Sequence, residues 1–183
     1  MNFDEKLFHS TYKDLEQHRD FSAIFFEALI PLLHEIGILW QTDTITPAHE
    51  HFISYLIKQK LLVTIEQLQS VPKKSDRAFV LFLPPNEIHE LGLLYLNYEI
   101  LRKGYKTIFL GPSIPLDCLT DIEKHFDNIT FVTYITVQPS PDSINEYLKG
   151  FGNKLLNHNQ SRLWVFSKSI ESIESQTISK KII

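Results

Sequence analysis

The fold is decided by residues 78–112, which open with the apolar run AFVLFL at 78–83. This run ends at Pro84-Pro85 and does not alternate with polar residues, which is typical of a parallel strand covered on both faces. A helical pattern at 93–101 and a second strand pattern at 105–110 follow. Strands that alternate with helices in this way predict a doubly wound parallel sheet of the α/β class.

The same alternation continues toward the C-terminus. Helices are expected at 116–126 and 143–156, strands at 129–137 and 163–166, and a further edge strand at 177–183. We therefore expect one α/β domain over residues 76–183, with ligands bound outside the carboxyl ends of its strands.

Before residues 70–76 the apolar residues recur every three and four positions, which indicates helices. Helical segments are expected at 3–15, 21–39 and 47–61, with a weaker fourth segment around Ile65 and Leu68. Asp20 is positioned to cap the second of these helices, and Pro31 is expected to bend or interrupt it. The sequence therefore predicts a four-helix bundle at residues 1–72.

Composition restricts the function. The 183 residues are 43% hydrophobic and 22% charged, with 22 acidic and 18 basic side chains and a net charge of −4. These values are globular, and an acidic chain carries no nucleic-acid footprint of its own. Cys118 is the only cysteine, so an intramolecular disulfide is excluded, and we expect it to be a small packing residue. No apolar run approaches the roughly 20 residues that span a bilayer, so a cytoplasmic protein without a membrane partner is expected.

The loop after the first strand carries one candidate metal ligand. It contains His89, with a carboxylate two residues before it at Glu87 and a glycine three residues after it at Gly92. An imidazole that binds a metal commonly donates its other ring proton to a carboxylate. The alternative is an exposed loop histidine without a ligand. No catalytic constellation was found, so we do not expect an enzyme.

The pattern Glu87-x-His89-x-x-Gly92 resembles the Asp-x-His-x-x-Gly signature of cobalamin-binding domains of the methionine-synthase and mutase type. The resemblance implies that His89 is the lower axial ligand of cobalt and that Glu87 is its hydrogen-bond partner. It also implies that the displaced nucleotide tail of cobalamin threads along the sheet.

Trp40 is followed after nine residues by Glu50-His51, which resembles the Trp-x9-Glu-His signature of light-responsive repressors of the MerR family. In that family a four-helix bundle covers the upper face of the corrin. The resemblance implies that Trp40 packs on the adenosyl group and that Glu50 hydrogen-bonds to it, with His51 adjacent. Without the resemblance, Trp40 is a helix-end aromatic and Glu50-His51 a solvated face. A zinc site of His49, Glu50 and His51 is disfavoured because adjacent helical residues do not face one another.

Five positions depart from these signatures. Glu87 replaces an aspartate, and Gln41 replaces the histidine that caps cobalt after illumination. Tyr134 lies near a small serine that admits the nucleotide base, so it either blocks this slot or substitutes its own hydroxyl. Ser167-Lys168 stands where the family has two glycines, and side chains there would crowd the groove.

The leading expectation is a sensor module of a MerR-type transcription regulator. Adenosylcobalamin would be clamped between the bundle and the α/β domain, and light or ligand loss would change homo-oligomerisation. DNA would be contacted only through a winged-helix domain that is absent from these residues. The alternatives are a corrinoid carrier protein of a methyltransferase system and a degenerate, ligand-free dimerisation module of the same fold.

Overall fold

The structure is a computed structural model that describes residues 3–70, 74–156, 160–167, 170–174 and 181–183. The chain forms two compact units, Met1–Glu66 and Gln67–Ile183. The predicted fold class, a helical N-terminal unit followed by a parallel α/β unit, is confirmed.

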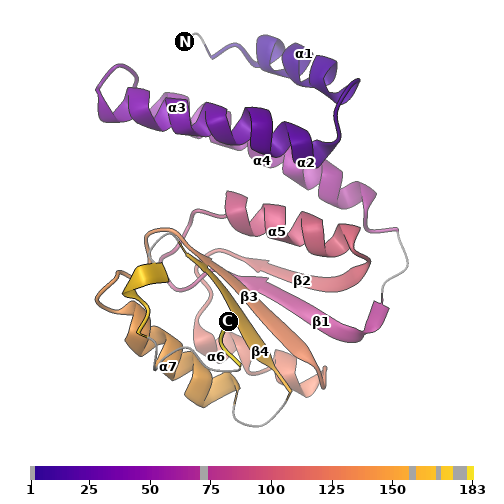
Figure 1. The fold of residues 1–183 in the computed structure, drawn as a ribbon, viewed down its shortest axis with the longest axis vertical. Helices are drawn as coiled ribbons and strands as arrows, with labels where there is room; N and C mark the ends of the chain where they lie inside the picture. The colour runs from indigo at the N-terminus through magenta and orange to yellow at the C-terminus, as the bar shows by residue number, and fades with distance from the viewer. Residues whose placement is uncertain (1–2, 71–73, 157–159, 168–169, 175–180) are drawn as a thin grey trace. The chain divides into compact units, whose positions relative to one another are not determined.

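The N-terminal unit is built from α-helices (Figure 1). Its elements are α1 (Glu5–Glu16), α2 (Phe21–Ile24), a π-helical turn (Phe25–Leu29), α3 (Ile30–Gln41) and α4 (Pro47–Gln67). The predicted cap at Asp20 is confirmed, since its side chain accepts a hydrogen bond of 2.8 Å from the N–H of Ala23. Apolar side chains such as Ile24, Ile57 and Leu61 are completely buried between these helices.

The expected interruption near Pro31 is present, because the turn before it widens to the π-helical pattern, in which the N–H of Ile30 bonds to the carbonyl of Phe25. The expected separate fourth segment is wrong at Ile65, which is buried near the end of the continuous helix α4. No proline or glycine lies between Leu61 and Ile65, so nothing breaks the helix there.

The joined run Phe21–Gln41 also corrects the expectation that no segment reaches membrane length. It is 21 residues long and contains an 18-residue window with a mean hydropathy of 1.6, which is enough to cross a bilayer by length and composition alone. The core helix of a soluble protein satisfies the same criterion. Because Glu27 and Glu35 interrupt the run, it is weak evidence for a membrane segment.

The C-terminal unit is a parallel sheet in the order β2-β1-β3-β4. Its strands are β1 (Lys74–Phe82), β2 (Tyr105–Gly111), β3 (Ile129–Ile135) and β4 (Arg162–Ser167). Helix α5 (Leu91–Arg102) lies on one face, and α6 (Leu116–Leu119) and α7 (Ile144–Leu155) lie on the other (Figure 1).

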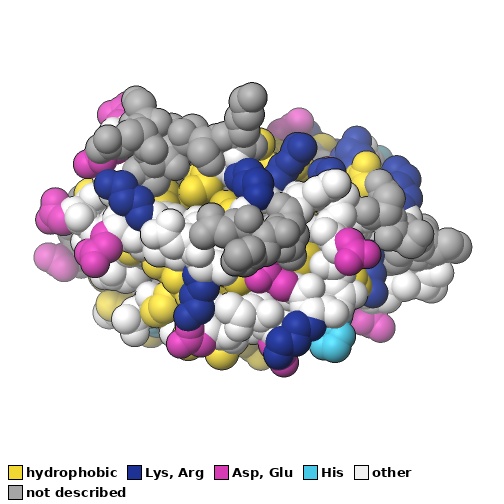
Figure 2. Space-filling view, turned by 90° about the horizontal axis from the view of Figure 1, so that it is seen from below, with side chains coloured by type: hydrophobic (Ala, Val, Ile, Leu, Met, Phe, Trp, Pro, Cys, Tyr) yellow, Lys and Arg dark blue, Asp and Glu magenta, His cyan; other side chains and the backbone are white. Residues whose placement is uncertain are grey.

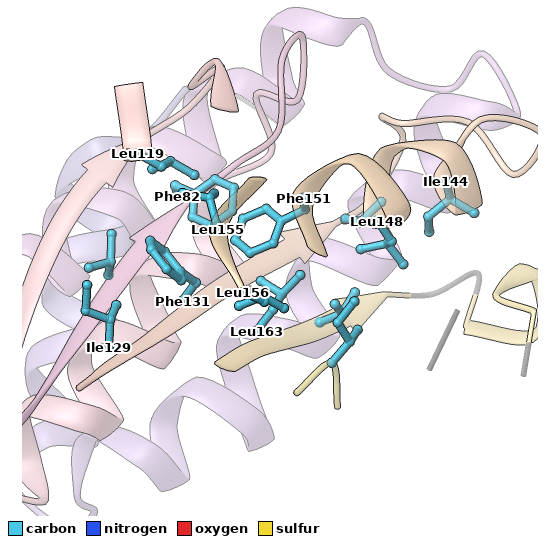
Figure 3. Packing of buried hydrophobic residues seen from close by; sticks show 14 residues of the cluster. Phe82, Leu119, Ile129, Phe131, Ile144, Leu148, Phe151, Leu155, Leu156 and Leu163 are labelled. Atoms are coloured by element: carbon cyan, nitrogen blue, oxygen red, sulfur yellow. The ribbon is translucent and has the colours of Figure 1, made fainter. Parts of the chain in front are cut away.

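Both faces of this sheet are packed, which explains the uninterrupted apolar run of β1. Val80 and Phe82 point toward the α7 side, where the ring of Phe82 stacks on Phe151 with 5.8 Å between centroids (Figure 3). Phe79 and Leu81 point to the opposite, α5 side. Because successive side chains of β1 point to opposite faces, the strand contributes to the hydrophobic cores on both sides of the sheet.

The region after β2 is less helical than expected. The predicted helix at 116–126 is reduced to α6 and a short 3-10 turn (Ile122–Lys124). The hydroxyl of Thr120 donates to the carbonyl of Asp117, a local bond that competes with helix continuation. The expectation for Cys118 is wrong, because its side chain is exposed while the neighbouring Leu119 is buried.

The expected edge strand at 177–183 is described only in part, because residues 177–180 lie outside the described residues. Ile182 forms a parallel bridge with Leu163 of β4. More important for function, the neighbours of β1 are β2 on one side and β3 on the other. The loops that follow β1 and β3 therefore meet at the topological switch point, where sheets of this kind bind ligands.

Candidate functional site

The loop that follows β1 is held to the loop that follows β2. The N–H of Asn86 donates to Oγ of Ser113 at 3.1 Å, and the N–H of Ser113 donates to the carbonyl of Glu87 at 3.1 Å. Asn86 and Ser113 adopt φ angles of 66° and 56°, the left-handed conformation that permits these tight turns. The loop that carries His89 is thus fixed by reciprocal hydrogen bonds.

The carboxylate of Glu87 joins this loop to the one after β3. The side chain is 0% exposed. Its Oε2 accepts hydrogen bonds from three consecutive backbone N–H groups, those of residues 136–138, at 3.0, 2.6 and 2.9 Å. Such a row of N–H groups is a backbone nest for an anion. A buried charge is thereby compensated across the switch point of the sheet.

The second oxygen of Glu87 orients His89. Oε1 accepts from the backbone N–H groups of Ile88 and His89 at 2.9 and 3.0 Å, and it lies 2.6 Å from Nδ1 of the His89 ring. Burial alone would raise the pKa of Glu87, but the hydrogen bonds from Val137, Gln138 and His89 outweigh it and lower the pKa to about 2.

An ionised carboxylate can only accept hydrogen bonds, so Nδ1 of His89 must carry the proton. In the neutral ring the lone pair therefore lies on Nε2, the nitrogen that a metal ion would bind. The side chain of His89 is 51% exposed, and its Nε2 has no hydrogen-bond partner within the part of the chain that the structure describes. This arrangement presents one basic nitrogen to a ligand outside the sheet.

Gly92 lies at the start of α5 against the ring of Tyr134. A Cβ atom placed on Gly92 would approach ring carbons of Tyr134 at 2.8–3.0 Å, which is closer than real contacts allow. The Tyr134 ring in turn stacks on Phe166 of β4, with centroids 6.5 Å apart and planes at 4°. Glycine is thus needed here because an aromatic ring occupies the space beside the helix.

The remaining predicted residue of this unit, Ser167, is half-buried at the end of β4 and pairs in register with Ile135. Lys168 lies outside the described residues. The structure therefore brings Glu87 together with His89, and Gly92 together with Tyr134.

The other predicted residues lie in the helical unit. Trp40 is 47% exposed near the end of α3, and Gln41 follows it as the last residue of that helix. Glu50 lies in the first turn of α4, where it accepts from the hydroxyl of Ser54 at 2.5 Å and lies 3.3 Å from Nδ1 of His51. A cavity of about 530 Å³ between α1, α3 and α4 is lined by neither Trp40 nor Glu50.

No group of three or more His, Cys, Asp or Glu that could hold a metal ion is found among the described residues, which does not support a zinc site at His49, Glu50 and His51. Sequence reasoning missed Ser113 and the backbone donors at 136–138. Ser113 follows Gly111 and Pro112, two residue types that are common in turns. The donors at 136–138 are backbone N–H groups, which no side-chain type marks in a sequence.

Comparison with known proteins finds similarity to one family model and to two transcriptional repressors. Residues 1–63 match the family model described as B12 binding domain. The chain is 34% identical over 95 residues to the HTH-type transcriptional repressor CarH of Myxococcus xanthus, which covers 52% of this chain and 31% of CarH. It is also 34% identical over 106 residues to the repressor CarA of the same organism, covering 58% of this chain and 34% of CarA.

The match therefore spans about a third of the length of these repressors. In fold, the chain is similar to a monomethylamine corrinoid protein of Methanosarcina barkeri, with a TM-score of 0.72, 11% identity, and coverage of 93% of this chain and 79% of that one. The resemblance drawn from the sequence is confirmed.

Proposed function

Because its first 63 residues match the B12 binding domain family model, we propose that this chain binds a corrinoid, with Nε2 of His89 as the lower axial ligand of cobalt. The observation that carries the proposal is the Glu87–His89 pair. A buried anion holds the proton on Nδ1 and directs a lone pair out of the switch point. The site offers one metal ligand, Nε2 of His89, and not a group of several side chains. It therefore suits a metal whose other ligands are supplied by a macrocycle.

A bound corrinoid would supply a cobalt ion whose axial bond to an upper alkyl group is weak enough to be broken. The residues of this chain would bind the corrinoid and orient its lower ligand. Glu87 fixes the tautomer and direction of the imidazole, and its ties to residues 136–138 couple the ligand to the loop after β3. A change in the bond between cobalt and His89 would thus affect the loop after β1 and, through Glu87, the loop after β3.

We assign the helical unit to the upper side of the corrinoid, with an adenosyl group as the preferred upper ligand. Trp40 is exposed enough to act as an apolar plate, and Glu50 provides a carboxylate near the start of α4. In this role the chain is a cytoplasmic sensor rather than an enzyme. Its response to light or ligand loss is a change in self-association, which follows only if the corrinoid binds one assembly state more tightly.

DNA contact, in this proposal, is made by a winged-helix domain outside these 183 residues. The chain itself has more acidic than basic side chains. Figure 2 shows acidic and basic side chains on the same face. A chain with this charge balance lacks the electrostatic attraction that drives phosphate-backbone binding.

A second candidate is the ligand-free packing module. It is favoured by one observation, the Tyr134 ring packed against Gly92, because this ring fills space beside the loop that carries His89. A corrinoid carrier of a methyltransferase system also remains as an outcome of the test. A carrier would require the same lower ligand, His89, but no aromatic contact from Trp40 to the upper group.

The test is retention of adenosylcobalamin by the purified protein in the dark, followed by desalting and a visible spectrum. We expect retained cofactor, loss of retention in His89→Ala, and full retention in the control His125→Ala, which removes an exposed histidine elsewhere in the same unit. If neither adenosylcobalamin nor cobinamide is retained, the proposal is wrong and the packing module stands.

A further inference from the structure

The α5 side of the sheet contains a small apolar cavity. It has a volume of about 230 Å³ and is lined by Leu96 of α5 and, from the sheet, by Val132, Trp164 and Phe166 among others. Val132, Leu96 and Trp164 belong to one packed cluster. The cavity is thus a gap in the layer between α5 and the sheet, where Phe79 of β1 and Tyr105 of β2 also line it.

Tyr134 lies between this cavity and the loop of His89. On β3 it follows Val132 by two residues, so it shares the α5 face and lies nearer the carboxyl end of the strand. On α5, Gly92 precedes Leu96 by one helical turn and contacts the Tyr134 ring. The loop of His89 comes just before Gly92.

The neighbouring strand closes the layer further. The ring of Phe166 lines the cavity and also stacks on the ring of Tyr134. The cavity wall is apolar, whereas the imidazole of His89 is half-exposed. The two stacked rings occupy the α5 side of the sheet at the carboxyl ends of β3 and β4, next to Gly92.

This geometry disfavours a complete cobalamin relative to a corrinoid without the lower base. When a protein imidazole takes the lower position on cobalt, the cofactor's own nucleotide base is released on that same side and needs space. The space beside Gly92 is filled by Tyr134, and a Cβ there would already be too close. A corrinoid without the nucleotide base needs no such space.

We propose that Tyr134 makes this site selective for corrinoids that lack the lower nucleotide base, of the cobinamide class, over complete cobalamins. This inference rests on the proposed corrinoid function and deepens it. Tyr134 acts here as a specificity-determining residue, since it excludes the base by occupying its path. It touches neither cobalt nor the upper ligand.

The experiment compares the dissociation constants of aquocobinamide and hydroxocobalamin by absorption titration, for the wild type and for Tyr134→Ser. Releasing the base from cobalt costs cobalamin the same free energy with either protein. The change in the ratio of the two constants therefore isolates the effect of Tyr134. We expect the wild type to prefer cobinamide and Tyr134→Ser to reduce that preference by about tenfold, equivalent to 1.4 kcal/mol.

Two further variants keep the test independent of folding defects. Phe166→Ala leaves Tyr134 in place but removes the ring that it stacks on, so we expect a smaller reduction in the same direction. Tyr134→Phe retains the ring and should retain the preference. A preference that changes by less than about threefold in both Tyr134→Ser and Phe166→Ala overturns the inference. If neither corrinoid binds the wild type, the corrinoid function fails as well, which distinguishes the two failures.

Discussion

Oε1 of Glu87 lies 2.6 Å from Nδ1 of His89, while Oε2 of the same carboxylate accepts three consecutive backbone N–H groups of the loop after β3. One buried anion therefore fixes both the imidazole and the switch point of the sheet. The stability of this edge and the availability of the His89 lone pair depend on the same group, so both can be tested by changing it.

Glu87→Gln should lower the free energy of unfolding by about 3 kcal/mol, because an amide has too few acceptor sites for its backbone donors and brings an NH₂ group of its own. Urea unfolding followed by circular dichroism measures this loss. The control Glu146→Gln, at an exposed position of α7, should change stability by less than about 0.5 kcal/mol. Equal stability of the two variants would show that the nest is not formed.

The pH dependence of stability follows from the lowered pKa of Glu87. Its carboxylate has a pKa of about 2 in the folded chain against 4.5 ordinarily, so its stabilising contribution is complete above pH 4.5 and is lost as the pH falls toward 2. The difference in unfolding free energy between the wild type and Glu87→Gln should therefore narrow over this window. A difference that stays constant from pH 4.5 downward would contradict the assignment.

The contact between Gly92 and Tyr134 predicts a coupling between two substitutions. Gly92→Ala should destabilise the chain, because its Cβ would lie 2.8 Å from the ring, and Tyr134→Ser should relieve that clash. A double-mutant cycle on unfolding free energies should give a coupling of about 1–3 kcal/mol. In contrast, Gly150→Ala in α7 has open space and should stabilise by about 0.5–1 kcal/mol. Additive effects of the first pair would contradict the packing.

Trp40→Ala tests the role proposed for the helical unit. If Trp40 contacts the adenosyl group, the variant should bind adenosylcobalamin about tenfold more weakly and methylcobalamin almost unchanged, because a methyl group offers no comparable surface. The matched control is Tyr55→Ala, which removes an exposed aromatic ring of α4. Equal losses for both cofactors would instead favour a carrier role.

The strands were predictable because their apolar residues form short continuous runs and do not recur at helical spacing. The run of β1 indicated a strand covered on both faces, and the structure places Val80 in one core and Leu81 in the other. The helix after β2 was overestimated, since apolar spacing alone does not register the competing bond of Thr120 to Asp117. The extent of α4 was underestimated because a weak apolar face was read as a break.

At the candidate site, the sequence indicated which side chains to examine but not what holds them. Glu87 was expected to partner His89, and the structure places them in hydrogen-bond contact. The three backbone donors to the same carboxylate come from residues 49 to 51 positions away, and no residue type encodes them. Whether Tyr134 would block or replace the small residue was also undecided by sequence, because this depends on the path of α5 past Gly92.

The central claim is that Nε2 of His89 binds cobalt. It is tested most directly by electron paramagnetic resonance of the protein loaded with cob(II)inamide, which has no base of its own. One axial nitrogen-14 nucleus splits each cobalt line into a triplet, and uniform ¹⁵N labelling of the protein should convert each triplet into a doublet. Spectra without nitrogen splitting, or with a splitting that persists unchanged in His89→Ala, would contradict the claim.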